Sequence, residues 1–388
     1  MRNKTAVGID IGSSQIKVVA MELANGSKPK ILGYGSALSQ GLKRGEIMDQ
    51  RELAASLKNC LQKCQDSSGF PVEEAYLAVD GENLKSFRAK GVAIVSRADG
   101  EITEYDIERA IETAKGNLGQ LMNREIIHAI AVSFKIDDNF QTQNPIGLKG
   151  MRLESDILFV TTLGRNLKSL IKALEINKVA VLKIISSPLA SSRLLLSKTQ
   201  KEVGAMLLDV GGTTMALSVF EEGVPISMEI LPIGSDHISH DLAIGFQISL
   251  EEAENLKTNI LNKNWGREEK RKLDEIIEAR FSDIFELVDR HLRKIGRHGL
   301  LPSGVILTGG GANMPGLSEY AKKFLKLPSN IYLPREEYDS SDESLYLPQW
   351  SSAIGLCFWA MDDLREGKRF AFSPRPSFVL KWLRTLLP

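Results

Sequence analysis

The sequence has little cysteine and no excess of either charge. Its 388 residues include three cysteines, which are too few for a disulfide framework and fit a reducing compartment. Lysine plus arginine and aspartate plus glutamate both total 49, so no global attraction to nucleic acid is encoded. No apolar run reaches the ~18 residues of a membrane-spanning helix, and the first residues lack the apolar segment of a signal peptide. We therefore expect a cytoplasmic protein with local charged patches.

The composition is otherwise that of a globular protein. It is 43% hydrophobic and 25% charged, and its length allows two or more domains. Strand and helix patterns alternate along the chain, which predicts an α/β fold. Cys60 and Cys64 lie one helical turn apart without a histidine or further cysteine at zinc spacing, so we expect core thiols.

An internal echo is the clearest organisational signal. TAVGIDIGSSQIKVVAMEL near the N-terminus is similar to GAMLLDVGGTTMALSVFEE in mid-chain, with Asp10 aligned to Asp209 and Gly12 to Gly211 at an offset of 199 residues. Each copy is predicted to form a strand, an Asp-x-Gly turn and a second strand. The pattern indicates a duplicated architecture in which two similar lobes face one ligand.

The first turn has the parts of a phosphate cradle. Backbone N–H groups from Gly12 through Ser13, Ser14 and Gln15 can converge on an anion, and Lys17 can neutralise it. Asp10 can hold a hydrated Mg²⁺. An ordinary hairpin turn would have the same local sequence.

Two further glycine-rich turns support the cradle. The second carries Asp209 and a phosphate edge made of Gly211, Gly212, Thr213 and Thr214. The third, ILTGGGANMPGL, places glycines between a strand and a helix, where a flat ring can approach the backbone. Between these turns, Glu254 and Lys257 lie three apart on one helix face, and alone they would form a solvated ion pair.

The ordered set of motifs resembles the actin/Hsp70/sugar-kinase superfamily and, within it, the FtsA family of bacterial cell-division proteins. The segments that carry the resemblance are ILGYGSALSQGLKRGEI, YLAVDG, NPIGLKGMRLESDILFVTT, LDVGGTTMALSVF, EEAENLK and ILTGGGANMPGL. It implies an actin-like two-lobed ATPase fold, built from duplicated ribonuclease-H-like domains with an inserted FtsA-type subdomain. It also implies ATP and Mg²⁺ as ligands: Asp10 and Asp209 hold the metal through water, and adenosine contacts Glu254, Lys257, Gly309, Gly310, Gly311 and Ala312.

The resemblance also divides the chain. Residues 1–86, 162–200 and 351–363 are expected to form subdomain 1A, and 87–161 the inserted subdomain 1C. Subdomain 2A would comprise 201–232 and 301–350, and 2B residues 233–300. A linker over 364–376 and an amphipathic membrane-targeting helix over 377–388 would follow.

One departure from the superfamily bears on catalysis. The segment Ser186-Ser187-Pro188-Leu189-Ala190 has a serine where relatives often have an acidic or amide residue that orients the attacking water. A serine hydroxyl is a poor general base near neutral pH. We therefore assign no catalytic residue and expect at most a slow ATPase, with nucleotide acting as a conformational or assembly ligand.

The last residues have the pattern of a membrane anchor. On a helical wheel, one apolar face lies opposite basic residues, which is typical of a helix lying on anionic lipid. A terminal helix docked on its own domain is the alternative. The residues predicted to contact the membrane are Phe378, Val379, Lys381, Trp382, Leu383, Arg384, Leu386 and Leu387.

A basic run near the end of the 251–296 helical region is a candidate protein-binding face, although such runs are usually solvated helix faces. The resemblance places it in subdomain 2B, where the FtsA family receives the acidic C-terminal peptide of the tubulin-like protein FtsZ. The candidate residues are Arg280, Phe281, Arg293, Lys294 and Arg297.

The sequence therefore predicts an ATP-binding, actin-like division protein at the cytoplasmic face of the membrane, at the septum. It would self-assemble, tether FtsZ filaments to anionic lipid through its C-terminal helix, and meet other division proteins but no nucleic acid. The alternatives are a PilM-type protein of type IV pilus assembly, which needs no anchor of its own, and a slow ATPase or phosphotransferase of the same superfamily.

Overall fold

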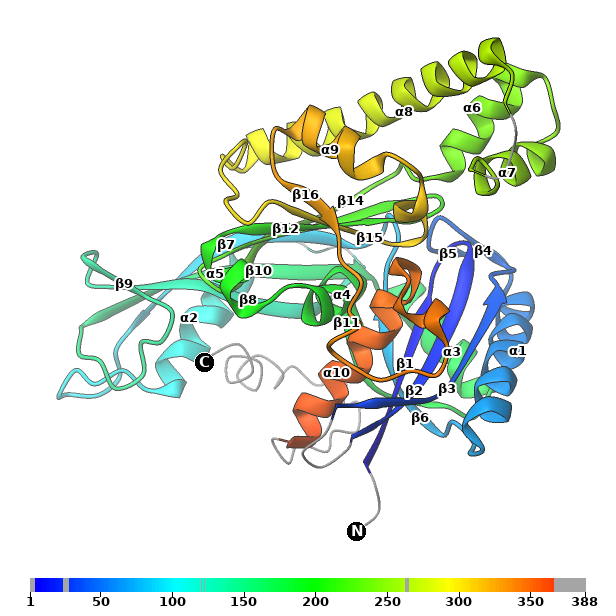
Figure 1. Ribbon diagram of the computed structural model, residues 1–388. Coiled ribbons are helices and arrows are strands. Elements are labelled where there is room, and N and C mark those ends of the chain that lie inside the picture. The colour runs from blue at the N-terminus through cyan, green and yellow to red at the C-terminus, as the bar shows by residue number, and fades with distance from the viewer. Residues whose placement is uncertain (1–3, 24–27, 120, 122, 262–264, 366–388) are drawn as a thin grey trace.

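The computed structural model describes residues 4–23, 28–119, 121, 123–261 and 265–365, arranged as two lobes and a laterally attached module (Figure 1). The predicted anchor over 377–388 and nearly all of the predicted linker lie outside the described residues. Within the described ranges, no helix is both long enough and apolar enough to cross a membrane.

The first lobe is built on a mixed five-stranded sheet. Three strands form an antiparallel meander, and two more run parallel to its first strand, giving the order β11-β6-β1-β2-β3. Residues on both faces of the central strands are buried, so these strands have nearly continuous apolar sequences. The strands are β1 (Lys4–Ile11), β2 (Gln15–Leu23), β3 (Lys30–Leu38), β6 (Glu74–Val79) and β11 (Ala180–Ser186).

The second lobe repeats this topology. Its order, β14-β13-β12-β15-β16, again joins an antiparallel meander to two parallel strands. Asp10 pairs across its hairpin with Lys17, and Asp209 pairs with Ala216 at the equivalent position. The predicted duplication is confirmed. The strands are β12 (Ala205–Val210), β13 (Met215–Glu221), β14 (Val224–Leu231), β15 (Val305–Thr308) and β16 (Ser329–Ile331).

In helix α1 (Gln50–Ser68), the local sequence determines where the helix begins and which face packs against the first lobe. The Asp49 carboxylate caps the N-terminus of α1 by accepting hydrogen bonds from the backbone N–H groups of Arg51 and Glu52. Its apolar face packs on β3, where Cys60 and Cys64 are buried and free, as predicted. The other helices of this lobe are α3 (Gly164–Ile176), α4 (Ser187–Leu195) and α10 (Ser351–Arg365).

Helices α4 and α10 pack unusually closely. A Cβ on Gly355 would lie 2.0 Å from the carbonyl oxygen of Ala190, so only glycine fits at this crossing. At the other end of α10, Lys183 Nζ donates to the buried Asp363 carboxylate at 2.8 Å. These contacts fix α10 against the first lobe.

The second lobe has a helical cap (Figure 1). The longest helix, α8, buries Phe281 and Phe285 against Tyr320 and Phe324 of the neighbouring α9. The 251–296 region divides into two helices, as expected. The helices of the cap are α6 (Asp236–Phe246), α7 (Leu250–Thr258), α8 (Arg267–Lys294) and α9 (Leu317–Leu325).

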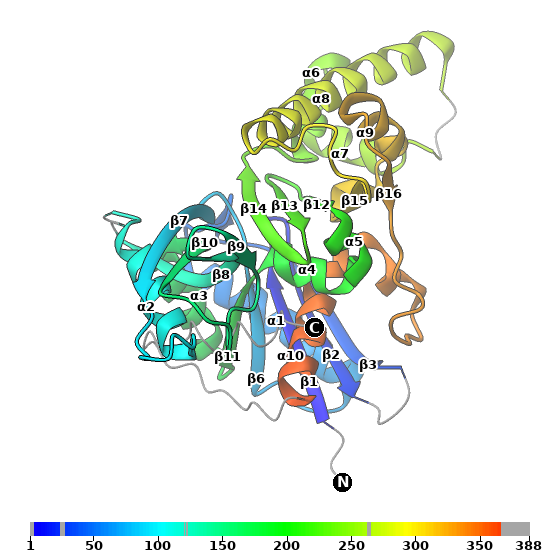
Figure 2. The same ribbon diagram turned by 90° about the vertical axis from the view of Figure 1, so that its left-hand side faces the viewer.

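The laterally attached module is an antiparallel sheet in the order β7-β10-β8-β9, covered by one helix (Figure 2). It has its own hydrophobic core, centred on Ile107, Phe134 and Phe159. Its elements are β7 (Lys85–Ile94), α2 (Glu104–Gly116), β8 (Arg124–Ile136), β9 (Phe140–Thr142) and β10 (Arg152–Leu163). The short elements elsewhere are β4 (Leu42–Lys43), β5 (Glu46–Ile47), α5 (Lys198–Val203), η1 (Gly310–Asn313), η2 (Glu343–Tyr346) and η3 (Pro348–Trp350).

Candidate nucleotide site

A cavity of about 600 Å³ lies between the lobes, at the ends of the central strands of both sheets. This volume is within the range of small-molecule pockets. Thr213 and Ala312 are the two predicted nucleotide-site residues that do not line it. The predicted residues that do are Asp10, Gly12, Ser13, Ser14, Gln15, Lys17, Asp209, Gly211, Gly212, Thr214, Glu254, Lys257, Gly309, Gly310 and Gly311.

The two duplicated turns have the same internal hydrogen bond. The Gly12 N–H donates to the Gln15 carbonyl at 3.1 Å, and the Gly211 N–H donates to the Thr214 carbonyl at 3.0 Å. These two amides therefore stabilise their own turns. The donors left for an anion in the first turn are the amides of Ser13 and Ser14, one residue further into the loop.

The third turn closes the cavity from the second lobe. Gly309 has φ +87°, and a Cβ there would lie 2.2 Å from Oδ1 of Asp209, so backbone conformation and space both require glycine. A Cβ on Gly310 would meet nothing within 4 Å. The backbone at Gly310 thus leaves open space on the cavity side, as a flat ring would need.

Glu254 and Lys257 do form an ion pair, at 2.7 Å, but it is not a solvated one. The Lys257 side chain is only 7% exposed and Glu254 is 48% exposed. Lys257 Nζ also donates to the Ser235 carbonyl at 3.3 Å, and Glu254 accepts from the Ser239 hydroxyl at 2.5 Å. The pair is held at the cavity wall in a fixed orientation.

Three carboxylates gather on the floor of the cavity. Burial, together with the neighbouring Asp80 and Asp10, raises the pKa of Asp209 to about 7. Burial likewise raises the pKa of Asp80 to about 6, with a contribution from Asp10. Asp10 has a raised pKa from burial, partly offset by Lys17. Each rise means that a negative charge is costly there without a cation.

Asp80 and Asp236 are the two carboxylates of the cavity lining that the sequence analysis did not predict, and Asp80 lies nearest the first turn in the strand register. It directly follows the buried strand β6, which runs parallel to β1. Because carboxyl ends of parallel strands meet at one sheet edge, Asp80 comes to lie beside the first turn. An aspartate immediately after the apolar run YLAV was the available signal.

The arrangement fits a hydrated magnesium ion. No three acidic, histidine or cysteine side chains among the described residues are placed to coordinate a metal directly. Among the residues that the structure describes, one oxygen of Asp80 and the Thr213 hydroxyl are buried and have no hydrogen-bond partner. Mg²⁺ usually keeps several waters, so Asp10 and Asp209 are suited to hold it through them.

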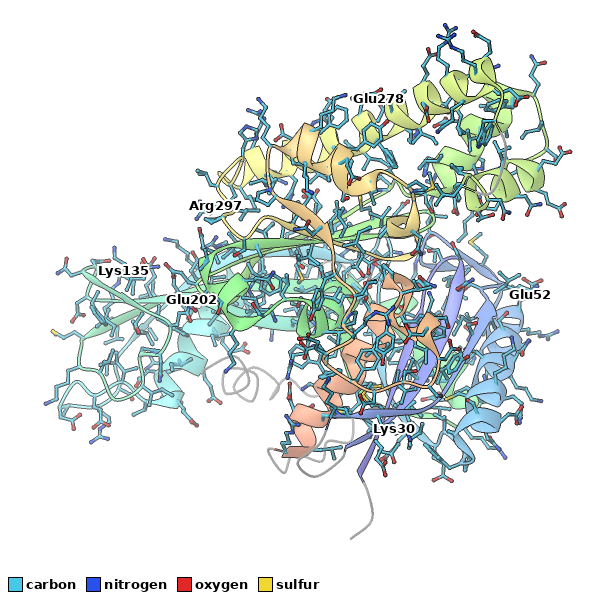
Figure 3. All side chains as sticks on the ribbon, viewed as in Figure 1. Lys30, Glu52, Lys135, Glu202, Glu278 and Arg297 are labelled. Carbon is cyan, nitrogen blue, oxygen red and sulfur yellow. The ribbon has the colours of Figure 1, made fainter. Side chains whose placement is uncertain are left out.

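The predicted peptide-binding residues are not brought together. Phe281 is 1% exposed and belongs to the core, and Arg280 pairs with Asp241 of α6 at 2.6 Å. Arg280 lies about 21 Å along α8 from Lys294. In Figure 3, Arg297 lies near one end of α8, away from the labelled Glu278 in the middle of the helix. Arg297 pairs with Glu221, whereas Arg293 and Lys294 are exposed.

Solved structures with similar folds show that this chain has an actin-like fold. Against the PilM–PilN type IV pilus biogenesis complex the TM-score is 0.71 at 16% identity, covering 91% of this chain and 98% of the other. Against MreB 5 of Spiroplasma citri bound to AMPPNP it is 0.53 at 13% identity, covering 95% and 100%. The fold is thus the predicted actin-like α/β fold with an inserted module.

Sequence comparison identifies the family. The profile described as "Cell division protein FtsA" matches residues 206–355, and "SHS2 domain inserted in FTSA" matches 81–161, which covers nearly all of the laterally attached module. The FtsA of Bacillus subtilis is 30% identical over 390 aligned positions, covering 95% of this chain and 87% of that protein. The chain belongs to the FtsA family of cell-division proteins.

The raised pKa of Asp209 predicts that removing its charge stabilises the ligand-free protein but weakens the binding of Mg-nucleotide. Its folded-state pKa of about 7 exceeds the ordinary 3.8, so the folded state without ligand loses stability as pH rises through this interval. Asp209→Asn should therefore raise the melting temperature in EDTA at pH 8, by a few degrees for roughly 1–2 kcal/mol, and less at pH 5. The same variant should bind Mg-nucleotide at least tenfold more weakly.

Differential scanning fluorimetry measures the change in melting temperature, and a nucleotide titration measures the change in affinity for Mg-nucleotide. An equal stability gain at both pH values, or unchanged Mg-nucleotide affinity, would contradict the proposed environment of Asp209.

Proposed function

We propose that the chain binds Mg-ATP in the interlobe cavity. The observation that carries this proposal is that two similar Asp-x-Gly turns, one from each lobe, line one cavity of about 600 Å³. A Cβ built on Gly212 would lie 2.1 Å from the Ser14 hydroxyl, so the two turns meet across the cleft. One polyphosphate can therefore touch both lobes, which makes nucleotide a conformational ligand.

The cavity lining suits each part of the nucleotide. The amides of Ser13 and Ser14 face the phosphates beside Lys17, and Glu254 with Lys257 provides polar contacts for ribose and adenine. Magnesium, held through water by Asp10 and Asp209, would neutralise charge between the phosphates and the carboxylates. The similar MreB 5 structure holds AMPPNP, which supports a nucleotide as the ligand.

The proposed cellular role follows from membership of the FtsA family. The protein would self-assemble at the cytoplasmic face of the membrane at the septum and tether FtsZ filaments there, together with other division proteins. We assign the first lobe to subdomain 1A, the inserted module to 1C, and the second-lobe sheet and its helical cap to 2A and 2B. The anchor is the amphipathic sequence over 377–388.

Membrane tethering is tested by co-sedimentation with liposomes. A single helix of about eleven residues binds weakly, so stable attachment requires several copies. With ATP and anionic vesicles, the full chain should pellet, whereas Trp382→Glu and a chain ending at Ser373 should stay in the supernatant.

Neutral phosphatidylcholine vesicles are the matched control, because Lys381 and Arg384 attract only anionic lipid. Equal supernatant fractions for all three proteins would show that the tail does not anchor, and would favour a role that needs no anchor.

For the FtsZ peptide, the exposed end of α8 is the part of the predicted face that stays accessible. Lys294→Glu should weaken binding of an acidic FtsZ C-terminal peptide at least fivefold, because a like charge would then face it. Lys270→Glu is the control: it lies on the same helix, exposed, about 36 Å away. Fluorescence anisotropy at low salt measures both, and equal effects of the two variants would place the peptide elsewhere.

A further inference from the structure

The position where the superfamily often carries a water-orienting residue holds Ser187 here, but the pairing of strands supplies a carboxylate beside it. Strands β1, β6 and β11 run parallel, with Asp10 level with Ala78 and Val79 level with Ser186. Two residues beyond Asp10 the three chains reach Gly12, Asp80 and Ser187. Asp80 therefore lies between the first phosphate turn and Ser187.

The Asp80 backbone is held rigidly. The following Gly81 has φ +98°, and a Cβ on it would lie 2.6 Å from the Cα of Gly45 in the neighbouring turn. On the far side of that contact, the Glu82 N–H donates to the Arg44 carbonyl at 3.3 Å. The backbone that carries the Asp80 carboxylate is thus held in place, as it must be for the side chain to orient a small reactant.

The side chains at this point have unused hydrogen-bonding capacity. Asp80 and Ser187 both line the cavity. Oδ1 of Asp80 and the Ser187 hydroxyl are each buried, and neither has a partner with good hydrogen-bond geometry among the described residues. Ser187 nevertheless lies close enough to Asp80 to offset part of the rise that burial causes in the pKa of the Asp80 carboxyl group. Buried polar atoms are normally paired, and a bound water is the usual way to satisfy two of them at once.

We propose that Asp80, assisted by the Ser187 hydroxyl, holds and orients the water that attacks the terminal phosphate of bound ATP. The proposal rests on the proposed nucleotide site. The water oxygen forms a bond to the γ-phosphorus as the bond from that phosphorus to the bridging oxygen breaks. The bridging oxygen leaves with ADP, taking the electron pair. One water proton passes to the Asp80 carboxylate and then to solvent, and inorganic phosphate is the second product.

The roles of the two residues differ. The carboxylate accepts the proton, which a serine hydroxyl does poorly near neutral pH. The Ser187 hydroxyl fixes the position of the water from the neighbouring strand end. The expectation of a slow ATPase without a catalytic carboxylate, drawn from Ser187 alone, thus gives way to one with a base on the adjacent strand.

The test uses the full chain and its Asp80→Asn variant. Asparagine keeps the size of the side chain and one acceptor but takes no proton, so single-turnover hydrolysis of ATP should fall roughly 100-fold. The dissociation constant for AMPPNP with Mg²⁺ should change less than threefold. Ser187→Ala should slow hydrolysis only several-fold. Glu82→Gln, two residues beyond Asp80 and outside the cavity, is the matched control and should leave the rate unchanged.

The readouts separate the possible failures. An unchanged hydrolysis rate in Asp80→Asn, or no hydrolysis by the unaltered chain that binds AMPPNP, overturns the assignment. A tenfold rise in the Mg²⁺ concentration needed for AMPPNP binding would make Asp80 a metal residue instead and also overturns it. Failure of the unaltered chain to bind AMPPNP refutes the proposed nucleotide site itself. If Asp80→Asn does not fold, Asp80→Ser, with its smaller uncharged side chain, takes its place under the same criteria.

Discussion

The interlobe cavity concentrates negative charge that the protein alone does not balance. Among the described residues lining it are five carboxylates, Asp10, Asp80, Asp209, Asp236 and Glu254, and two lysines, Lys17 and Lys257. Burial raises the pKa of the first four, so a negative charge on each costs more than it would in water. Taking unpaired charge out of water is costly. A polyphosphate would add more negative charge, so we expect a divalent cation to bind with it.

The duplication explains why the charge gathers where it does. Both sheets carry an antiparallel meander beside two parallel strands, and both direct the Asp-x-Gly turn of their first hairpin toward the same cavity. The two copies have diverged where they line the cavity. Lys17 faces Asp10 in the first copy, whereas Ala216 faces Asp209 in the second. Two residues beyond the position level with each aspartate, the adjacent parallel strand leads to Asp80 in the first copy and to Gly310 in the second. The first lobe therefore places a carboxylate there, whereas the second lobe leaves open space.

Much of this was predictable because it is encoded locally. A strand, an Asp-x-Gly turn and a strand are contiguous in sequence, so the echo at 199 residues revealed both hairpins. The place of Asp80 depends instead on the register between β6 and β11, which are about a hundred residues apart and joined through the inserted module. Phe281 was assigned to the surface for a different reason. It continues the four-residue apolar spacing of Leu273, Ile277 and Phe285, which predicts a core position. The basic residues near it in the sequence instead favoured its interpretation as part of an exposed binding face.

The most direct test of the central claim is a calorimetric titration of the full chain with AMPPNP, once with excess Mg²⁺ and once with EDTA. We expect saturable binding at one site per chain with Mg²⁺. Binding should be at least tenfold weaker when the cation is removed, because the carboxylates and phosphates then repel each other without a counter-charge. Absence of binding with Mg²⁺, or equal affinity in both conditions, would contradict the central claim.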